Sequence, residues 1–171
     1  DGTATQKGKI IVVDDNSDMR RYIKQLLQDH FHVITSVNGE DALQKIEQHA
    51  PQLVLSDIMM PVMDAVQLMQ AIKNNPSTKS VPVILLSARA GEEARIVGYE
   101  IGADDYLVKP FSANELIARI KSQFKLARIR KEVESNLRNL ILQSPVAMAL
   151  LRGPSLTVEL VNAGALEIWG K

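Results

Sequence analysis

The sequence contains no cysteine, which excludes disulfide bonds, thiolate zinc sites and thiol catalysis. This absence fits a protein that works in a reducing compartment. The three histidines, His30, His32 and His49, do not have a spacing that is typical of metal-binding motifs. Any site for chemistry must therefore be built mainly from other side chains.

An excess of charge of one sign and long apolar runs are also lacking. Twenty Lys and Arg residues balance twenty Asp and Glu residues, so no global basic field is available for direct binding of nucleic acid. The longest purely apolar stretch, residues 146–151, is far too short to cross a bilayer. We therefore expect no nucleic-acid binding, no membrane segment here and a cytoplasmic location, although a parent protein could be membrane-anchored.

The length of 171 residues allows one complete domain with a remainder. Two complete domains are not expected, because a domain takes roughly 150 residues. The chain begins Asp1-Gly2-Thr3, without Met and without a signal-like apolar run, so we expect it to be an excised segment of a longer protein.

Short apolar runs rich in β-branched residues alternate with longer segments of helical spacing, which is typical of βαβ units around a parallel sheet. The expected strands are residues 10–13, 33–37, 53–56, 83–87 and 106–108. The expected helices are residues 17–29, 38–48, 65–74 and 91–101, and the first two have Ser17 and Asn38 as N-caps. The predicted fold class is α/β, a doubly wound five-stranded parallel sheet with helices on both faces.

A further helix is expected to begin near Ser112, where Ser-Ala-Asn-Glu forms a capping-box sequence. Residues 116–143 contain no Pro and no Gly, so one long helix is the simplest interpretation. The linker stripe is our name for its apolar residues at spacings of 3, 4, 4 and 3, namely Leu126, Ile129, Val133, Leu137 and Leu140. Either residues 125–143 are a solvated helix packed on their own domain, or they are a helical linker that pairs with a second copy to form a homodimer; the charged flanks favour the linker.

The last segment, residues 144–171, contains two strand-like runs, 146–151 and 156–161, with a Gly153-Pro154 turn between them. A short helix is expected over residues 162–169. Because a hairpin and one helix cannot bury a core alone, we interpret this segment as a fragment of a larger domain.

Polar side chains stand where four of the expected strands end. Asp14 and Asp15 follow the first strand, Asp57 the third, Ser87 ends the fourth and Lys109 follows the fifth. In an open parallel sheet, ligands bind beyond the carboxyl ends of the strands, so these residues are predicted to line one pocket. Three converging carboxylates repel each other by several kcal/mol unless a cation lies among them, and oxygen ligands suit Mg²⁺.

These residues and their flanking motifs resemble the response-regulator receiver domain of two-component signalling over residues 9–124. The resemblance is carried by Ile-Val-Val-Asp-Asp at 11–15, Leu-Ser-Asp-Ile-Met-Met-Pro-Val-Met-Asp at 55–64, Leu-Leu-Ser-Ala-Arg at 85–89 and Gly-Ala-Asp-Asp-Tyr-Leu-Val-Lys-Pro-Phe at 102–111. It implies a flavodoxin-like receiver fold that accepts a phosphoryl group from a histidine kinase or a phosphotransfer domain.

The resemblance also implies roles for the residues of the acidic pocket. Asp57 is expected to be the phosphoacceptor and Asp15 a direct Mg²⁺ ligand, with Asp14 assisting through water. The backbone carbonyl of Met59 is expected to complete the protein ligands of the metal.

Three further residues match the parts of a receiver that hold and sense the phosphoryl group. Ser87 is expected to bind a phosphoryl oxygen as the moving switch hydroxyl, and Lys109 to neutralise another oxygen. Tyr106 matches the aromatic residue whose ring turns inward when that hydroxyl moves. The bond between Lys109 and Pro110 is cis in the family.

The chain departs from the family pattern at one position, where Ala65 stands in place of the usual Gly. If this position needs a positive φ, alanine costs roughly 1 kcal/mol or shifts the loop. No residue expected to bind the phosphoryl group is lost by this change.

The end of the chain resembles the opening of a PAS domain. The resemblance lies in residues 139–148, in Val-Asn-Ala at 161–163 and in Ile-Trp-Gly at 168–170. It predicts a receiver domain over 9–124, a helical linker over 125–143 and a truncated α+β PAS start over 144–171. This order is found in hybrid sensory histidine kinases.

Two other functions are compatible with part of this pattern. A hydrolase of the haloacid dehalogenase type also uses Asp, Mg²⁺, Ser or Thr and Lys, but its nucleophile follows the first strand in an Asp-x-Asp pattern, unlike Asp57. A receiver-like module that is never phosphorylated is the remaining alternative. A receiver promotes its own phosphoryl transfer, and whether a parent chain also carries a kinase core stays open.

Overall fold

The computed structural model describes residues 7–88 and 102–170 of the chain. It divides into two compact units, Asp1–Ala127 and Arg128–Lys171. The expected helix over 91–101 lies outside the described residues. Within the described residues, no helix combines the length and the apolar character needed to cross a membrane.

The first unit is built on a five-stranded sheet in the order β2-β1-β3-β4-β5, and every pairing in it is parallel. The five strands are β1 (Lys9–Val13), β2 (His32–Ser36), β3 (Leu53–Asp57), β4 (Val83–Ser87) and β5 (Asp105–Val108). Each agrees with the sequence-based strand to within one or two residues at its ends. The predicted parallel α/β sheet is confirmed.

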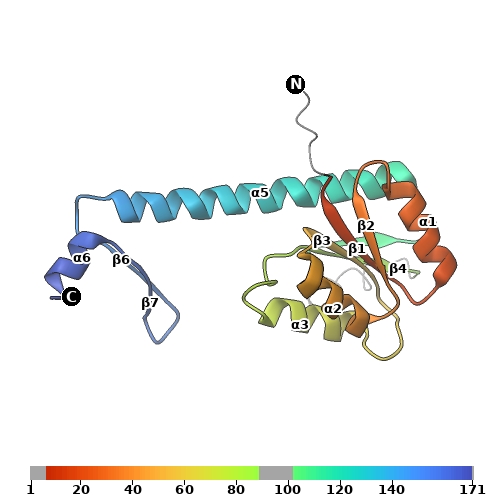
Figure 1. The fold of residues 1–171 in the computed structure, drawn as a ribbon, viewed down its shortest axis with the longest axis horizontal. Coiled ribbons are helices and arrows are strands. Elements are labelled where there is room, and N and C mark those ends of the chain that lie inside the picture. Colours follow the sequence, from red (N-terminus) through yellow and green to blue (C-terminus); the bar gives the residue numbers. More distant parts are fainter. Residues whose placement is uncertain (1–6, 89–101, 171) are drawn as a thin grey trace, which may run out of the picture. The chain divides into compact units, whose positions relative to one another are not determined.

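Helices cover both faces of this sheet (Figure 1), and its apolar strands are therefore buried on both sides. Alternate residues of β1 belong to different hydrophobic clusters: Ile10 and Val12 pack with α1 (Ser17–Leu27) and the beginning of α5 (Ala113–Gln143). Ile11 and Val13 pack with α2 (Gly39–His49) and α3 (Ala65–Asn74). Successive side chains of a strand point to opposite faces of the sheet, so a continuously apolar strand can pack against helices on both faces. The doubly wound arrangement follows from this.

The N-cap of α1 differs from the sequence-based expectation. Asn16, not Ser17, is the capping residue, and its side-chain oxygen accepts the amides of Asp18 and Met19. Asn16 has an extended backbone, whereas Ser17 is already the first helical residue, so only Asn16 can present its side chain to these free amides. The predicted cap of α2, Asn38, is confirmed by its bond from the amide of Asp41.

The backbone at position 65 does not have the positive φ for which glycine would be preferred. Ala65 is the first residue of α3, it is only 2% exposed, and its φ is not positive. Asp64 and Gln67 form a reciprocal capping box before it. The left-handed residue of this loop is instead Val62, with a φ of 70°. The condition under which alanine would carry a conformational cost at position 65, a positive φ, is therefore not met.

The helix α5 is a single element of 31 residues, as its lack of Pro and Gly predicted. The hydroxyl of Ser112 accepts a hydrogen bond from the backbone amide of Glu115 at 3.1 Å, which caps the beginning of the helix. Leu116 and Ile120 then pack into the core beside β1 and β3. Gln123, which is 6% exposed, donates to the backbone of Asp104 and ties this part of the helix to the residue before β5.

After the end of α5, the second unit contains an antiparallel hairpin and one short helix. Its elements are β6 (Ala149–Arg152), β7 (Thr157–Val161) and α6 (Ala163–Ile168). Asn162 is 1% exposed and organises the unit: its side chain accepts the amides of Met148 and Ala165. Its amide nitrogen donates to the carbonyls of Ser144 and Val146. Both strand-like runs expected from the sequence form strands. β6 begins three residues later than expected, and β7 begins one residue later.

Candidate functional site

The predicted site residues meet at one edge of the sheet because β1, β3, β4 and β5 are neighbours and run parallel. Asp14 follows β1, Asp57 and Ser87 are the last residues of β3 and β4, and Lys109 follows β5. The sequence separations are large, but the parallel order brings all four strand ends together.

Three carboxylates form the centre of the site. One oxygen from each of Asp14, Asp15 and Asp57 can be chosen so that all three lie within 4.8 Å of one another. Asp14 is buried at 1% exposure, whereas Asp15 is exposed to solvent. Charges at this separation repel on the order of 3 kcal/mol per pair near a protein surface, so the cluster favours a bound cation.

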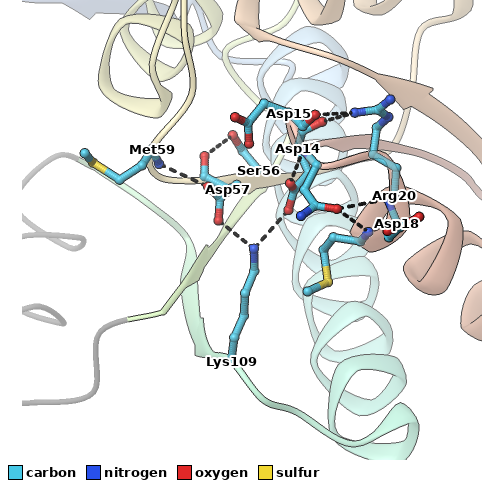
Figure 2. A network of polar contacts seen from close by, with 10 residues as sticks. Asp14, Asp15, Asp18, Arg20, Ser56, Asp57, Met59 and Lys109 are labelled. Carbon is cyan, nitrogen blue, oxygen red and sulfur yellow. Dashed lines mark hydrogen bonds and ion pairs between the residues drawn. The ribbon is translucent and has the colours of Figure 1, made fainter.

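The ammonium of Lys109 lies between two of these carboxylates (Figure 2). Its Nζ donates to Oδ1 of Asp57 at 2.7 Å and to Oδ2 of Asp14 at 2.9 Å. Burial by itself lowers the pKa of Lys109, but the hydrogen bonds and the charges of Asp57 and Asp14 outweigh it, so the pKa is raised. Lys109 is therefore a fixed positive charge at this edge of the sheet.

The Asp57 carboxylate is oriented from both sides. Its Oδ2 accepts the backbone amide of Met59 at 3.2 Å, and its Oδ1 faces Lys109. The hydroxyl of Ser56 donates to the backbone carbonyl of Asp57 at 2.9 Å, which fixes the end of β3. Met59 is 76% exposed, and its contact with Asp57 is made by its backbone amide.

The loop that carries Asp14 and Asp15 is tied to its surroundings by backbone groups. The amide of Asp14 donates to Ser36 at 3.2 Å, and its Oδ1 accepts the amide of Asn16 at 2.9 Å. Arg20 donates through Nη1 to the carbonyls of Asp14 at 2.7 Å and Asp15 at 2.9 Å (Figure 2). The sequence-based reasoning missed Arg20; its signal was a cation in the first turns of the helix that follows the acidic pair.

Comparison with known proteins identifies this combination of fold and site. Residues 10–121 match the family model described as "Response regulator receiver domain". The chain belongs to this family. The receiver domain is thus a component of phosphorelay signal transduction, as its resemblance to two-component proteins predicted.

Curated relatives and solved structures agree with this assignment. The chain is 45% identical over 123 residues to "Probable transcriptional regulator ycf27" of Pyropia yezoensis, covering 71% of this chain and 49% of that protein. It is 37% identical over 120 residues to "Histidine kinase P4" of Formosa agariphila, covering 70% of this chain and 9% of that protein. The receiver domain of the Francisella response regulator 1452 is similar at a TM-score of 0.64 and 32% identity, covering 70% and 98% of the two chains. The chain therefore spans about half of one curated relative and a small part of the other.

Two further predicted residues of the receiver domain lie on β4 and β5. Ser87 is 5% exposed, and its carbonyl accepts the amide of Lys109 at 2.7 Å. Tyr106 lies on β5, opposite Leu85 of β4, and is 2% exposed within the cluster formed with α2 and α3. The bond between Lys109 and Pro110 is cis, as the resemblance implied. The structure therefore brings every residue expected to contact the phosphoryl group to the same edge.

Proposed function

We propose that Asp57 accepts a phosphoryl group from a histidine kinase or a phosphotransfer domain. The observation that carries this proposal is the ammonium of Lys109, which lies 2.7 Å from Oδ1 of Asp57 beside two further carboxylates. The ionised carboxylate of Asp57 can attack phosphorus. The ammonium of Lys109 beside it can then stabilise the negative oxygens of the incoming phosphoryl group. In the transfer, the Asp57 oxygen forms a bond to phosphorus while the P–N bond of a phosphohistidine breaks, and the imidazole keeps the electron pair.

The residues present fit a Mg²⁺ ion. The three carboxylates whose oxygens approach within 4.8 Å supply only hard oxygen ligands, which Mg²⁺ prefers. We propose that Asp14, Asp15, Asp57 and the backbone carbonyl of Met59 hold it. When bound, the ion supplies positive charge that offsets the repulsion between the carboxylates and the incoming phosphoryl oxygens.

The chain's own groups orient and stabilise the transfer. The Met59 amide holds Oδ2 of Asp57, so the direction of the acceptor carboxylate is set before the donor arrives. Lys109 stabilises the negative charge on the phosphoryl oxygens. Because the ammonium of Lys109 also donates a hydrogen bond to Asp14, it is held close to the carboxylate cluster.

Intact mass spectrometry after incubation with acetyl phosphate tests this proposal. We expect one added phosphoryl group with Mg²⁺, none after chelation with EDTA and none in Asp57→Asn. The exposed Asp29→Asn is the matched control and should be modified like the wild type. A chain that stays unmodified with Mg²⁺ would favour the alternative, an interaction module that is never phosphorylated.

We further propose that Ser87 and Tyr106 form the conformational switch. Ser87 ends β4 next to the acceptor strand, and Tyr106 lies on the neighbouring strand β5. The buried ring of Tyr106 corresponds to the inward arrangement that the family resemblance attributes to the switched state. On this view, the hydroxyl of Ser87 binds a phosphoryl oxygen and the pair biases a pre-existing equilibrium. Replacement Ser87→Ala should leave phosphorylation intact but abolish the change in the NMR signals of Tyr106.

We propose that this segment is cytoplasmic and belongs to a hybrid sensor histidine kinase, with a receiver domain over 9–124, a linker over 125–143 and a PAS start over 144–171. The hairpin and helix of the second unit, organised by the buried Asn162, support the PAS proposal. Histidine kinase P4 contains a region similar to the receiver, which supports the kinase context. Sequencing the parent gene on both sides of this segment tests it, and a gene without PAS or kinase sequences would contradict it.

A homodimer through residues 125–143 is proposed from the exposure of the linker stripe. Its five side chains are 41% to 71% exposed, although all are large and apolar. Leaving such side chains in water costs on the order of 1 kcal/mol each. At about 100° per residue, the stripe is roughly a third of a turn from Leu116 and Ile120, which pack on the sheet. A second helix can therefore cover the stripe while α5 stays packed on its own sheet.

Sedimentation of the whole chain at tens of micromolar tests the homodimer. Val133→Glu places a charge in the middle of the stripe and should convert a dimer into a monomer. Ser135→Glu adds the same charge to the opposite face of the helix and should leave the dimer intact. A wild-type chain that sediments as a monomer, both with and without phosphorylation, would show that the linker is a solvated spacer.

A further inference from the structure

One guanidinium nitrogen holds the backbone of both aspartates in the acidic loop. Nη1 of Arg20 donates to the carbonyl of Asp14 at 2.7 Å and to that of Asp15 at 2.9 Å. Arg20 is partly buried and lies on α1, whose N-cap is Asn16, the residue that follows the pair. The same short segment therefore supplies the two carboxylates and the helix that orients them.

These two bonds restrict the loop more than either would alone. The carbonyls of Asp14 and Asp15 belong to consecutive peptide planes, so binding both to one rigid, planar group fixes the angle between the planes. The direction of each side chain from its Cα atom depends on these planes. Asp14 has additional anchors through Ser36 and Asn16, whereas Asp15 is exposed.

We propose that Arg20 is a positioning residue for cation binding by the acidic loop. It holds Asp15 in the direction that brings its carboxylate within 4.8 Å of those of Asp14 and Asp57. This inference rests on the proposed Mg²⁺ site, and it assigns the preorganisation of that site to a residue that does not contact the ion. Residues of this kind typically change metal affinity by roughly 10- to 100-fold when they are lost.

Electrostatics and positioning predict effects of opposite sign, which makes the proposal testable. Arg20 carries a positive charge near a site for a divalent cation, so removing that charge alone should tighten Mg²⁺ binding. Removing the two carbonyl bonds should free the loop and weaken Mg²⁺ binding. A weaker affinity in Arg20→Met therefore cannot be an effect of charge alone.

Calorimetric titration of the whole chain with Mg²⁺ is the first measurement. We expect Arg20→Met to weaken the affinity roughly tenfold or more. Arg21→Met removes the same charge from the next residue, whose side chain is 72% exposed and pairs with Asp18, so its affinity should stay within about twofold of the wild type. Urea unfolding of each variant checks that the fold is retained.

The Mg²⁺ dependence of phosphorylation by acetyl phosphate separates positioning from damage to the fold. For Arg20→Met we expect a higher Mg²⁺ concentration at half-maximal rate and a largely preserved rate at saturating Mg²⁺. Arg20→Lys keeps the charge without the planar double donor and should bind Mg²⁺ with intermediate affinity. If Arg20→Met does not fold, Arg20→Lys decides the question by the same criterion.

The outcomes distinguish this inference from the proposed function. A wild-type chain that binds no Mg²⁺ would remove the proposed metal site itself. A wild type that binds Mg²⁺ together with an Arg20 variant of equal or tighter affinity would overturn only the role assigned to Arg20. Equal weakening in Arg20→Met and Arg21→Met would also overturn it, because the effect would then belong to the helix.

Discussion

The ammonium of Lys109 lies 2.7 Å from Oδ1 of Asp57, across 52 residues of sequence. The same nitrogen lies 2.9 Å from Oδ2 of Asp14, so one cation is shared between two carboxylates. The side chains of Asp14, Asp57 and Lys109 are 2%, 15% and 17% exposed, and the attraction is therefore only weakly screened by solvent. This shared ion pair couples the stability of the receiver domain to the occupancy of its acidic site.

Replacing Lys109 by Met should destabilise the receiver domain in the absence of Mg²⁺. The change leaves Asp14 buried beside Asp57 without its cation, which costs about 3 kcal/mol of unfolding free energy. Added Mg²⁺ should restore part of this loss, and urea unfolding with and without the ion measures it. Lys45→Met breaks a more exposed ion pair with Asp41 and should cost less than about 1 kcal/mol, independently of Mg²⁺. Equal losses in the two variants would contradict the prediction.

Replacing Val62 by Asn should stabilise the protein. Val62 has a φ of 70° and a β-branched side chain, and it is 69% exposed, so little packing would be lost. Asn tolerates the left-handed region better, and we expect a gain of about 1 kcal/mol in the free energy of unfolding. Val37→Asn is the control, because Val37 is also exposed but does not have a positive φ. A loss of stability in Val62→Asn would show that the strain is absent.

Acid should weaken the beginning of α2 through Asp41. Burial by itself raises the pKa of this carboxyl. The hydrogen bonds that it accepts from Lys45 and from the Val37 amide, together with the charge of Lys45, outweigh burial, so the pKa lies below its usual value of 3.8. The ionised form therefore stabilises the fold above pH 3.8, and this contribution is lost as the pH falls through the lower folded value. Asp41→Asn should remove on the order of 0.5 kcal/mol at neutral pH and flatten this part of the acid profile. An acid profile of urea stability that Asp41→Asn leaves unchanged would contradict the prediction.

The second unit should unfold when Asn162 is replaced by Ala. The substitution removes four side-chain hydrogen bonds around a residue that is 1% exposed and leaves their backbone partners unsatisfied. We expect a loss of about 2 to 4 kcal/mol, which a hairpin and one helix cannot tolerate. Hydrogen exchange should then show loss of protection in residues 144–170 and unchanged protection in β1, β3 and β4. Ser155→Ala, in the exposed turn, should have no such effect.

Local patterns were sufficient to predict most of the fold. The apolar runs predicted all five strands of the sheet, because strands buried on both faces need continuous apolar residues. The absence of Pro and Gly predicted a single α5 helix. The acidic cluster and Lys109 also followed from the sequence, since parallel strands place their carboxyl ends at one edge.

Other features depended on the path of the backbone. The sequence favoured Ser17 as the cap of α1, but the extended conformation of Asn16 decided which side chain faces the free amides. The sequence also singled out Ala65 as a position where a positive φ would carry a cost, whereas the residue with a positive φ is Val62, three residues earlier. Residue type alone does not specify φ at neighbouring positions of a loop, because several backbone paths satisfy the same hydrophobic pattern.

The sequence by itself determined which residues reach the functional edge, and the tertiary structure decided how they are held there. Strand periodicity is local, so it predicts the element and the end at which Asp14, Asp57 and Lys109 stand. The two hydrogen bonds from Arg20 to the acidic loop require a particular angle between a helix and two peptide planes. No pattern of residue types encodes this angle. That angle results from packing α1 against β1 through the core, where close packing allows few alternatives.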